Sequence, residues 1–209
     1  AVAIADRWEE RFGRRPVFIP YGGEAPQHVD ASLLAEHGLA ARSYVLLVAR
    51  LVPENSVEIF LEAVQAISPD FPVVVVGSAS NSPTLRAVSS ARDQGRVIWL
   101  GHVSDQAKLH ALWRNCGVYF HGHTSGGTNP ALLQAMANEA PIVALDTAFS
   151  REVLGDYFPL VSADSAVIRD EISRLLTDRD EARRRAVAGR RRVEGHYRWS
   201  EVCRAYESL

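Results

Sequence analysis

Residues 118–138, VYFHGHTSGGTNPALLQAMAN, carry the clearest signal of the fold. The stretch begins with an apolar run of strand length, Val118–Phe120, and ends with an amphipathic run of helical length, Ala131–Asn138. Between these runs lies a loop with two adjacent glycines, which closes on Asn129-Pro130, an N-cap residue followed by a first-turn proline. A strand, a glycine-rich loop and a helix in this order predict one βα unit.

The same rhythm repeats on both sides of this unit. Four further apolar runs have strand length: Tyr44–Ala49, Val73–Val76, Val97–Leu100 and Ile142–Leu145. Amphipathic stretches of helical length separate them, at Val57–Ile67, Thr84–Arg92 and Ala107–Asn115, and Ser82-Pro83 and Ser104-Asp105 mark two helix starts. Strands that are apolar on both faces and alternate with helices predict an α/β fold with an open, doubly wound parallel sheet. Ligands of such sheets bind beyond the carboxyl ends of the strands, so we expect the site in the loops that follow them.

The two ends of the chain have a different pattern. Ala1–Arg11 predicts a helix, and Pro16–Gly23 predicts an extended connector that ends in a turn. From Asp164 to Leu209 the sequence is polar and helix-prone, with no further strand. Two arginine runs in this part, Arg183–Arg185 and Arg190–Arg192, alternate with acidic residues, which favours a solvated helix with internal ion pairs over phosphate or lipid binding.

Composition excludes several kinds of chemistry. The 209 residues carry 23 Lys+Arg and 25 Asp+Glu, a net charge of −2, so we expect no nucleic-acid partner. Lys108 is the only lysine and has no P-loop around it, which excludes P-loop nucleotide binding and disfavours kinase and Schiff-base chemistry. Cys116 and Cys203 are too far apart for a C-x-x-C motif, and a reducing cytoplasm is the default. No apolar run approaches the ~18 residues of a spanning helix.

The glycine-rich loop favours binding of an anion, with a phosphate or a diphosphate as the expected ligand. The alternative, a tight turn with no ligand, is weakened by the expected position of the loop at the carboxyl edge of the sheet. His121 and His123 alternate along the strand end and so face the same way, which raises the hypothesis of a zinc pair. No third ligand is near, so hydrogen-bonding roles are favoured. Neither Gly-x-Ser-x-Gly nor Gly-x-Gly-x-x-Gly occurs, which disfavours a serine hydrolase and a dinucleotide oxidoreductase.

A cation is expected at the same edge, because Arg50 follows the first strand. Its guanidinium suits bidentate contact with phosphate. The alternative is a surface ion pair with Glu54 or Glu58. Two further turns follow strands and are expected at the same edge of the sheet. At Gly77-Ser78 the backbone leaves space for the same ligand, and at Gly101-His102 a planar nucleotide base could lie against the backbone and the ring.

Five segments carry a resemblance to a known family: Val48–Asn55 (VARLVPEN), Val74–Ser78 (VVVGS), Ile98–Val103 (IWLGHV), Gly126–Ala137 (GGTNPALLQAMA) and Pro141–Ala144 (PIVA). They look like the donor half of retaining GT-B glycosyltransferases of family 4, and the match spans nearly the whole chain. The loop His121–Pro130 is similar to that of a bacterial cell-surface polysaccharide subgroup that includes rhamnosyltransferases.

This resemblance implies a protein of two Rossmann-like domains, of which the chain is one half. Residues 1–23 would be an interdomain linker with a remnant helix, residues 24–197 the nucleotide-sugar-binding domain, and residues 198–209 a helix that returns toward an N-terminal acceptor domain. The implied activity is retaining transfer of a hexose or deoxyhexose, rhamnose included, to a cell-surface glycan or a lipid-linked acceptor. This chain alone is expected to be inactive. No metal and no cofactor are expected, and the protein is expected in the cytoplasm, with peripheral association of the full-length form at the inner face of the membrane.

Residue by residue, the resemblance makes Arg50 a diphosphate ligand and the amides of Gly127–Asn129 the anion cradle. Catalysis is then expected to be electrostatic, because Arg50 and the helix N-terminus near Asn129 would stabilise the diphosphate as it leaves. Asn55 stands where the family has a diphosphate-binding lysine, and Gly126 and Gln134 stand where it has two glutamates, for the sugar and the ribose. The candidate donor-binding residues are Arg50, Asn55, Gly77, Ser78, Gly101, His102, His123, Ser125, Gly126, Gly127, Thr128, Asn129 and Gln134, with His123 and Ser125 as replacements for the sugar contact.

Because Gly126 and Gln134 replace the two glutamates of the family, a second function is also considered. In that alternative the chain is a non-catalytic nucleotide-sugar-binding module, or a degenerate transferase that serves as a partner subunit. An epimerase of similar architecture would need acid/base carboxylates at the cleft, and the sequence indicates none.

Overall fold

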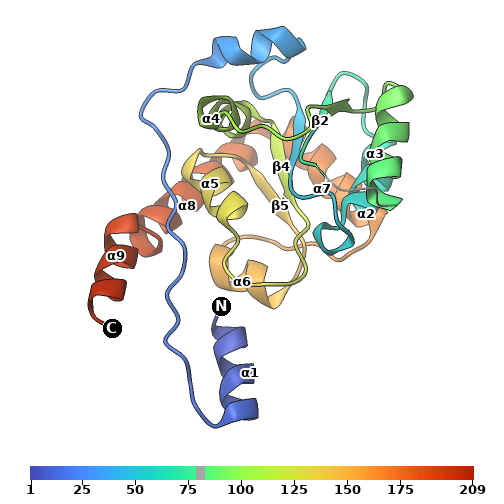
Figure 1. Cartoon of the computed structure of the whole chain (residues 1–209). Helices are drawn as coiled ribbons and strands as arrows, with labels where there is room; N and C mark the ends of the chain where they lie inside the picture. The colour runs from blue at the N-terminus through green and yellow to red at the C-terminus, as the bar shows by residue number, and fades with distance from the viewer. Residues whose placement is uncertain (79–82) are drawn as a thin grey trace.

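The computed structural model describes residues 1–78 and 83–209, and at its centre lies a sheet of five parallel strands (Figure 1). The strands are β1 (Val45–Val48), β2 (Val73–Val76), β3 (Ile98–Trp99), β4 (Val118–His121) and β5 (Ile142–Ala144), in the spatial order β3-β2-β1-β4-β5. The helices between them are α2 (Val57–Val64), α3 (Pro83–Asp93), α4 (Gln106–Asn115) and α5 (Pro130–Ala137). The expected doubly wound parallel α/β sheet is confirmed, with the bounds of most elements shifted by one to three residues.

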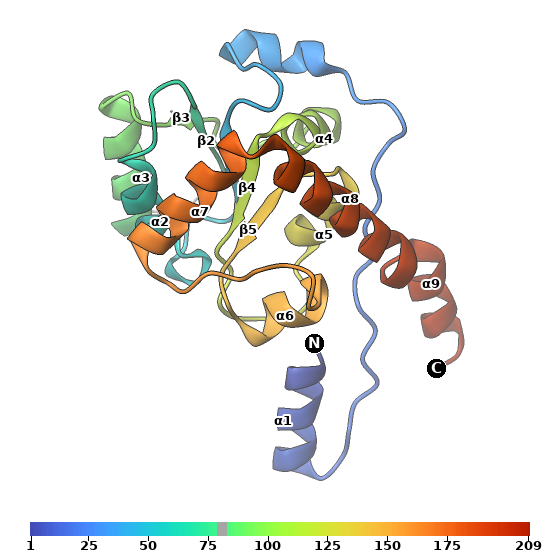
Figure 2. The same cartoon turned by 180° about the vertical axis from the view of Figure 1, so that it is seen from behind.

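The side chains of β1 explain why helices cover both faces of the sheet. Leu46 packs into a core with α4, α5 and the 3-10 helix η1 (Ala31–His37), whereas Val45 and Leu47 pack into a second core with α2, α3 and α7 (Ser165–Thr177). Successive side chains of a strand point to opposite faces, so a strand that is apolar at every position needs a layer on each side. Figures 1 and 2 show these two layers.

Two of the expected helix starts are found; Asn129 caps α5 as expected, and the cap of α4 is Asp105, one residue after Ser104. Asp105 accepts hydrogen bonds from the amides of Ala107 and Lys108, and Asn129 accepts from those of Ala131 and Leu132. The expected cap at Ser82 lies outside the described residues. Both observed caps place helix N-termini at the carboxyl edge of the sheet.

The C-terminal part is helical, and no strand is found there in the described residues, as expected. From Asp164 onward it contains α7, α8 (Arg179–His196) and α9 (Trp199–Glu207), and a further helix, α6 (Ala148–Leu154), precedes them. The sequence did not indicate α6, because seven residues are too few for a helical period to stand out. None of the helices in the described part of the chain is both long and apolar enough to span a bilayer.

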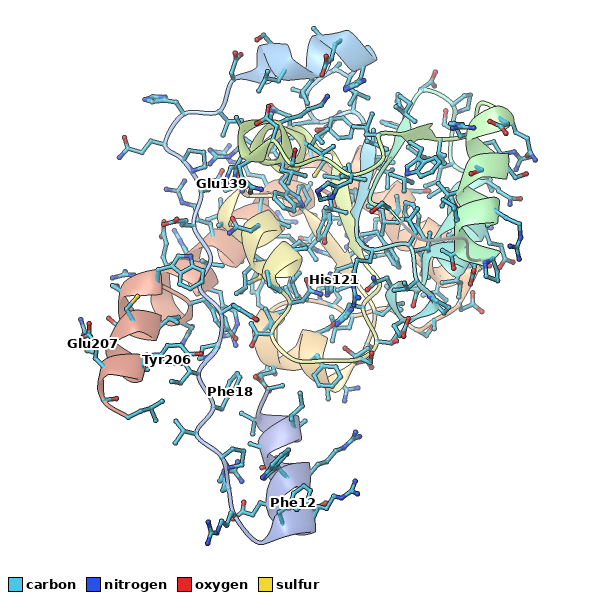
Figure 3. The ribbon with its side chains drawn as sticks, in the orientation of Figure 1. Phe12, Phe18, His121, Glu139, Tyr206 and Glu207 are labelled. Atoms are coloured by element: carbon cyan, nitrogen blue, oxygen red, sulfur yellow. The ribbon has the colours of Figure 1, made fainter. Side chains whose placement is uncertain are left out.

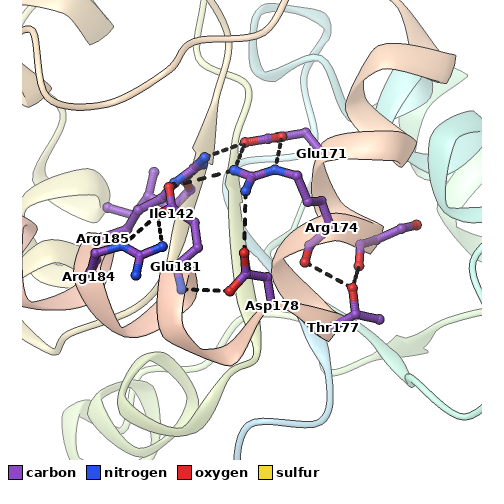
Figure 4. A network of polar contacts seen from close by, with 9 residues as sticks. Ile142, Glu171, Arg174, Thr177, Asp178, Glu181, Arg184 and Arg185 are labelled. Carbon is purple, nitrogen blue, oxygen red and sulfur yellow. Dashed lines mark hydrogen bonds and ion pairs between the residues drawn. The ribbon is translucent and has the colours of Figure 1, made fainter.

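One arginine of the expected solvated helix is buried, which corrects that prediction. Arg185 on α8 has no exposed surface, and its guanidinium binds Glu171 of α7 at 2.5 Å, Glu181 at 2.9 Å and the carbonyl of Ile142 at 3.3 Å (Figure 4). The neighbouring Arg184 is exposed and pairs with Glu181 at 3.0 Å. A buried charge is tolerated only when it is paired and hydrogen-bonded, so the network joins α7, α8 and β5 in one arrangement.

The N-terminal segment runs along the outside of the domain. Helix α1 (Val2–Phe12) contacts α6 through the amide of Val2, which donates to Glu152 at 2.7 Å. Residues 14–26 form no strand and no turn, so the turn expected at Gly22-Gly23 is wrong. These glycines allow a close approach instead: a Cβ at Gly22 would lie 2.6 Å from the ring of Trp199, and the amide of Gly23 donates to the carbonyl of Tyr197 at 2.8 Å.

Candidate functional site

The carboxyl ends of β1 and β4 lie side by side at the point where the strand order changes direction. From β1 the chain continues to β2 and β3 on one side, whereas β4 and β5 lie on the other side. A pocket of about 270 Å³ opens at this point, and its lining includes Arg50, Asn55, Tyr119, His121, His123 and Asn129. Such a switch point is where open α/β sheets bind ligands.

A larger hollow lies elsewhere. It measures about 620 Å³ and lies between α8 and the segment that follows α6. None of the residues predicted for the site lines it, so the smaller pocket is the candidate site.

The guanidinium of Arg50 has no carboxylate partner among the residues that the structure describes. The alternative interpretation from sequence, an ion pair with Glu54 or Glu58, is therefore wrong. Glu58 instead accepts a hydrogen bond from Thr84 at 2.6 Å, and Glu54 joins another loop through its carbonyl. An exposed arginine at the rim of a pocket, without a counter-charge, is available to an anion.

The loop after β1 is tied to the loop after β4. The amide and the hydroxyl of Thr124 both donate to the carbonyl of Glu54, at 2.8 and 3.0 Å. Nδ1 of His123 lies 2.7 Å from Oδ1 of Asn55, which is only 6% exposed. A Cβ at Gly122 would lie 2.6 Å from the carbonyl oxygen of Asn55, so only glycine permits this approach.

The start of α5 offers fewer free amides than the sequence predicted. Pro130 has none, and those of Ala131 and Leu132 donate to the side chain of Asn129 at 2.9 and 3.4 Å. The N-cap therefore uses two of the donors of the first helical turn. The amides of residues 127–129 make no hydrogen bond to a described residue, so they remain as the candidate cradle.

His121 differs from His123 in its surroundings. It is buried at the end of β4 (Figure 3), and its Nδ1 lies 3.5 Å from the hydroxyl of Tyr119. Burial, with a smaller effect of His123, lowers the pKa of His121 to about 3, so this ring stays neutral at ordinary pH. No group of three or more His, Cys, Asp or Glu that could hold a metal ion is found in residues 1–78 and 83–209.

Four of the predicted ligands lie along the same edge but do not line the pocket: Gly77, Ser78, Gly101 and His102. The amide of Gly77 donates to the carbonyl of Gly101 at 2.7 Å, and the amide of Leu51 donates to that of Ser78 at 3.2 Å. A Cβ at Gly77 would lie 1.8 Å from the carbonyl oxygen of Ala49. The glycine is thus required where the ends of β1 and β2 meet.

The other predicted residues lie in the loop and on α5, outside the pocket lining. Ser125 and Gly126 are exposed, and a Cβ at Gly127 would lie 3.5 Å from the backbone nitrogen of Ala1. Oγ1 of Thr128 and Oε1 of Gln134 are buried without a hydrogen bond to any described residue.

Gly122 and Thr124 were not among the residues predicted for the site. Both act on partners in the loop after β1, far away along the chain. The one feature of the sequence that could have indicated Gly122 is its position between His121 and His123.

With this geometry in view, comparison with known proteins assigns the class. A family model described as glycosyl transferases group 1 matches residues 34–192, and the chain belongs to this family. Among curated proteins it is similar to alpha-maltose-1-phosphate synthase of Mycolicibacterium smegmatis, with 27% identity over 189 residues, or 83% of this chain and 49% of the relative. The chain therefore spans about half the length of that relative.

Solved structures share the fold. Sucrose-phosphate synthase from Thermosynechococcus elongatus matches with a TM-score of 0.81 and 20% identity over 98% of this chain and 55% of that chain. Anabaena Alr3699/HepE in complex with UDP-glucose matches with a TM-score of 0.80 and 17% identity over 100% of this chain and 62% of that chain. The C-terminal domain of the Francisella tularensis group 1 protein LpcC matches with a TM-score of 0.69 and 18% identity over 84% of this chain and 96% of that chain. The parallel five-stranded sheet is thus that of a Rossmann-like GT-B domain.

Proposed function

We propose that the chain is the donor-binding domain of a glycosyltransferase and that it binds a nucleotide diphosphate sugar in the pocket between β1 and β4. The observation that carries this proposal is the guanidinium of Arg50 at the switch point, which has no carboxylate partner in residues 1–78 and 83–209 and shares a pocket with His123 and the start of α5. Family membership supports it, and the similar Anabaena protein has been solved with UDP and with UDP-glucose.

The proposed chemistry is electrostatic. As the bond between sugar and diphosphate breaks, negative charge develops on the diphosphate. Arg50 and the amides of residues 127–129 would stabilise that charge with donors already in place. No metal is needed in this proposal.

The finer proposal concerns the sugar and the acceptor. We propose retaining transfer of a hexose or deoxyhexose, rhamnose included, to a cell-surface glycan or a lipid-linked acceptor, in the cytoplasm or at the inner face of the membrane. The likeness of the loop His121–Pro130 to the rhamnosyltransferase subgroup supports this.

The proposed domain organisation places an acceptor domain against both ends of the chain. Residues 1–23 would be the linker, 24–197 the donor-binding domain and 198–209 the helix that returns to the acceptor domain. Exposed aromatic side chains support this: Trp8 and Phe12 on α1, and Trp199 and Tyr206 on α9. Figure 3 shows Phe12 and Tyr206 away from the sheet, where a second domain would cover them.

A second candidate function is a non-catalytic nucleotide-sugar-binding module. One observation favours it: the pocket lining contains no Asp or Glu. The full-length protein distinguishes the two functions, because only a transferase consumes a nucleotide sugar in the presence of an acceptor.

The experiment is a thermal-shift panel of nucleoside diphosphates and nucleotide sugars on the 209-residue chain, followed by a transfer assay. A ligand that binds only the folded state raises its stability by mass action. We expect a shift with at least one diphosphate, no shift with the matching nucleoside, and no transfer by this chain alone. Absence of any shift at saturating ligand would overturn the proposed donor site.

A further inference from the structure

The contact between Asn55 and His123 fixes which nitrogen of the histidine carries hydrogen. Nδ2 of Asn55 donates to the carbonyl of Arg50 at 2.7 Å, which leaves Oδ1 facing Nδ1 of His123, also at 2.7 Å. An amide oxygen only accepts hydrogen bonds, so Nδ1 must be the protonated nitrogen. A neutral His123 therefore presents a lone pair at Nε2.

This lone pair has no donor. No described residue hydrogen-bonds to Nε2, which faces Gly126, where a Cβ would lie only 2.9 Å away. The ring also lines the pocket that contains Arg50. Nε2 becomes a hydrogen-bond donor only when a second proton binds to the ring.

The groups around His123 favour the neutral form of its ring. Burial, followed by the positive charge of Arg50 at the end of β1, lowers the pKa of His123, and Glu54 in the loop after β1 raises it by less. From β4 the ring of His121 lies 6.1 Å away between centroids and is itself neutral, and the start of α5 contributes the uncharged Asn129. A bound anion would reverse this balance, since an opposite charge within a few ångströms favours the protonated ring.

We propose that His123 is a proton-linked ligand of the donor's diphosphate: as the nucleotide sugar binds, Nε2 takes up one proton from solvent and donates it in a hydrogen bond to a phosphoryl oxygen. Asn55 is the positioning residue, because it prevents the neutral ring from offering an N–H at Nε2. This inference rests on the proposed function, since it takes the pocket to be the donor site.

Two consequences follow for binding. Binding of the nucleotide sugar is coupled to uptake of up to one proton by the protein. The affinity falls as pH rises, by up to about tenfold per pH unit, between the pKa of His123 in the free protein and its higher pKa in the complex.

The experiment is titration calorimetry with UDP-glucose and dTDP-glucose at one pH in buffers of different ionisation enthalpy. Unlike a terminal phosphate monoester, the phosphates of a nucleotide sugar have no second ionisation near neutral pH, so any proton taken up belongs to the protein. We expect uptake approaching one proton for the unchanged chain. His123→Gln should abolish the uptake and make the affinity independent of pH. His196→Gln, at the exposed end of α8, should keep it.

Asn55→Ala tests the positioning role separately. Without the amide oxygen, the neutral ring can place its hydrogen on Nε2 and donate without protonation. Proton uptake should therefore drop well below that of the unchanged chain, while some binding persists; a variant that merely loosened the loop would bind less but take up the same number of protons.

The outcomes separate the two proposals. If neither nucleotide sugar binds to the unchanged chain at any pH, the proposed function fails and the inference with it. If one binds without proton uptake, or if His123→Gln keeps the uptake, the inference is wrong and the donor site stands. The measurement on the unchanged chain decides the matter even if a variant does not fold.

Discussion

Among single residues, Arg50 is the positively charged one in the pocket, and no Asp or Glu that the structure describes lines the pocket to neutralise it. We expect Arg50→Ala to weaken nucleoside diphosphate binding by roughly 1.5–3 kcal/mol, the usual size of a charge-assisted hydrogen bond, and to leave nucleoside binding unchanged. Calorimetry with both ligands measures this, and an unchanged melting temperature shows that the fold persists. Arg86→Ala, at an exposed position of α3, is the matched control. Equal losses for nucleoside and diphosphate would mean that Arg50 acts through structure.

Gln134 is the residue that bears on the nucleotide. The family resemblance places it at the donor ribose, and its buried Oε1 has no partner among the described residues. A carboxylate accepts from two hydroxyls, whereas an amide offers one oxygen, so a glutamine suits a deoxyribose. We expect Gln134→Glu to strengthen UDP or GDP binding more than dTDP binding, by about 1 kcal/mol.

The same calorimetry on the three diphosphates checks this prediction. Equal gains for all three would contradict a preference for deoxyribose. No change for any of them would remove Gln134 from the site.

At the scale of elements, Arg185 joins α7, α8 and β5. We expect Arg185→Met to destabilise the domain by about 3 kcal/mol, because it removes the buried partner of Glu171 and Glu181, which then keep only the exposed Arg174 and Arg184 among the described residues. Arg184→Ala removes an exposed pair with the same Glu181 and should cost at most about 1 kcal/mol. Urea unfolding compares the two variants, and similar losses would contradict the special role of Arg185.

The network also predicts a dependence of stability on pH. The hydrogen bond from Arg185 lowers the pKa of Glu181 against the opposing effect of burial. The Glu181 carboxylate thus binds a proton less readily in the folded state than in the unfolded state. Its contribution is complete above the ordinary glutamate pKa of about 4.3 and is lost as pH falls through the lower pKa of the folded state. Between about pH 6 and 3, the free energy of unfolding should fall less steeply for Arg185→Met than for the unchanged chain. An equal fall in both proteins would contradict this.

At the scale of the whole molecule, the connector binds the end of α8 and the start of α9 to the domain. We expect Gly22→Ala to destabilise this attachment by about 1–3 kcal/mol, because the new methyl group would overlap the ring of Trp199. Gly195→Ala, where a Cβ meets nothing within 4 Å in α8, should be neutral or stabilising. Hydrogen exchange at the amide of Gly23, which donates to Tyr197, reports the attachment directly. Unchanged protection in Gly22→Ala would show that the connector adapts.

The alternation of strands and helices, the parallel sheet and the edge that holds the site could all be predicted from the sequence alone. These depend on apolar periodicity, caps and glycines, which act between near neighbours in the chain. The sequence also placed Arg50 and the loop 121–130 at one edge, since the carboxyl ends of parallel strands must meet there. The residues that line the pocket are all drawn from that edge.

Which side chains meet could not be predicted in this way and became visible only in the folded molecule. Asn55 and His123 are 68 positions apart, and the burial of Arg185 depends on Glu171, 14 positions away on another helix. The role of Gly22 likewise depends on Trp199 at the other end of the chain. Such contacts depend on how whole elements pack, and a local pattern cannot specify them: an arginine among charged residues looks the same in sequence whether its helix face meets water or two carboxylates.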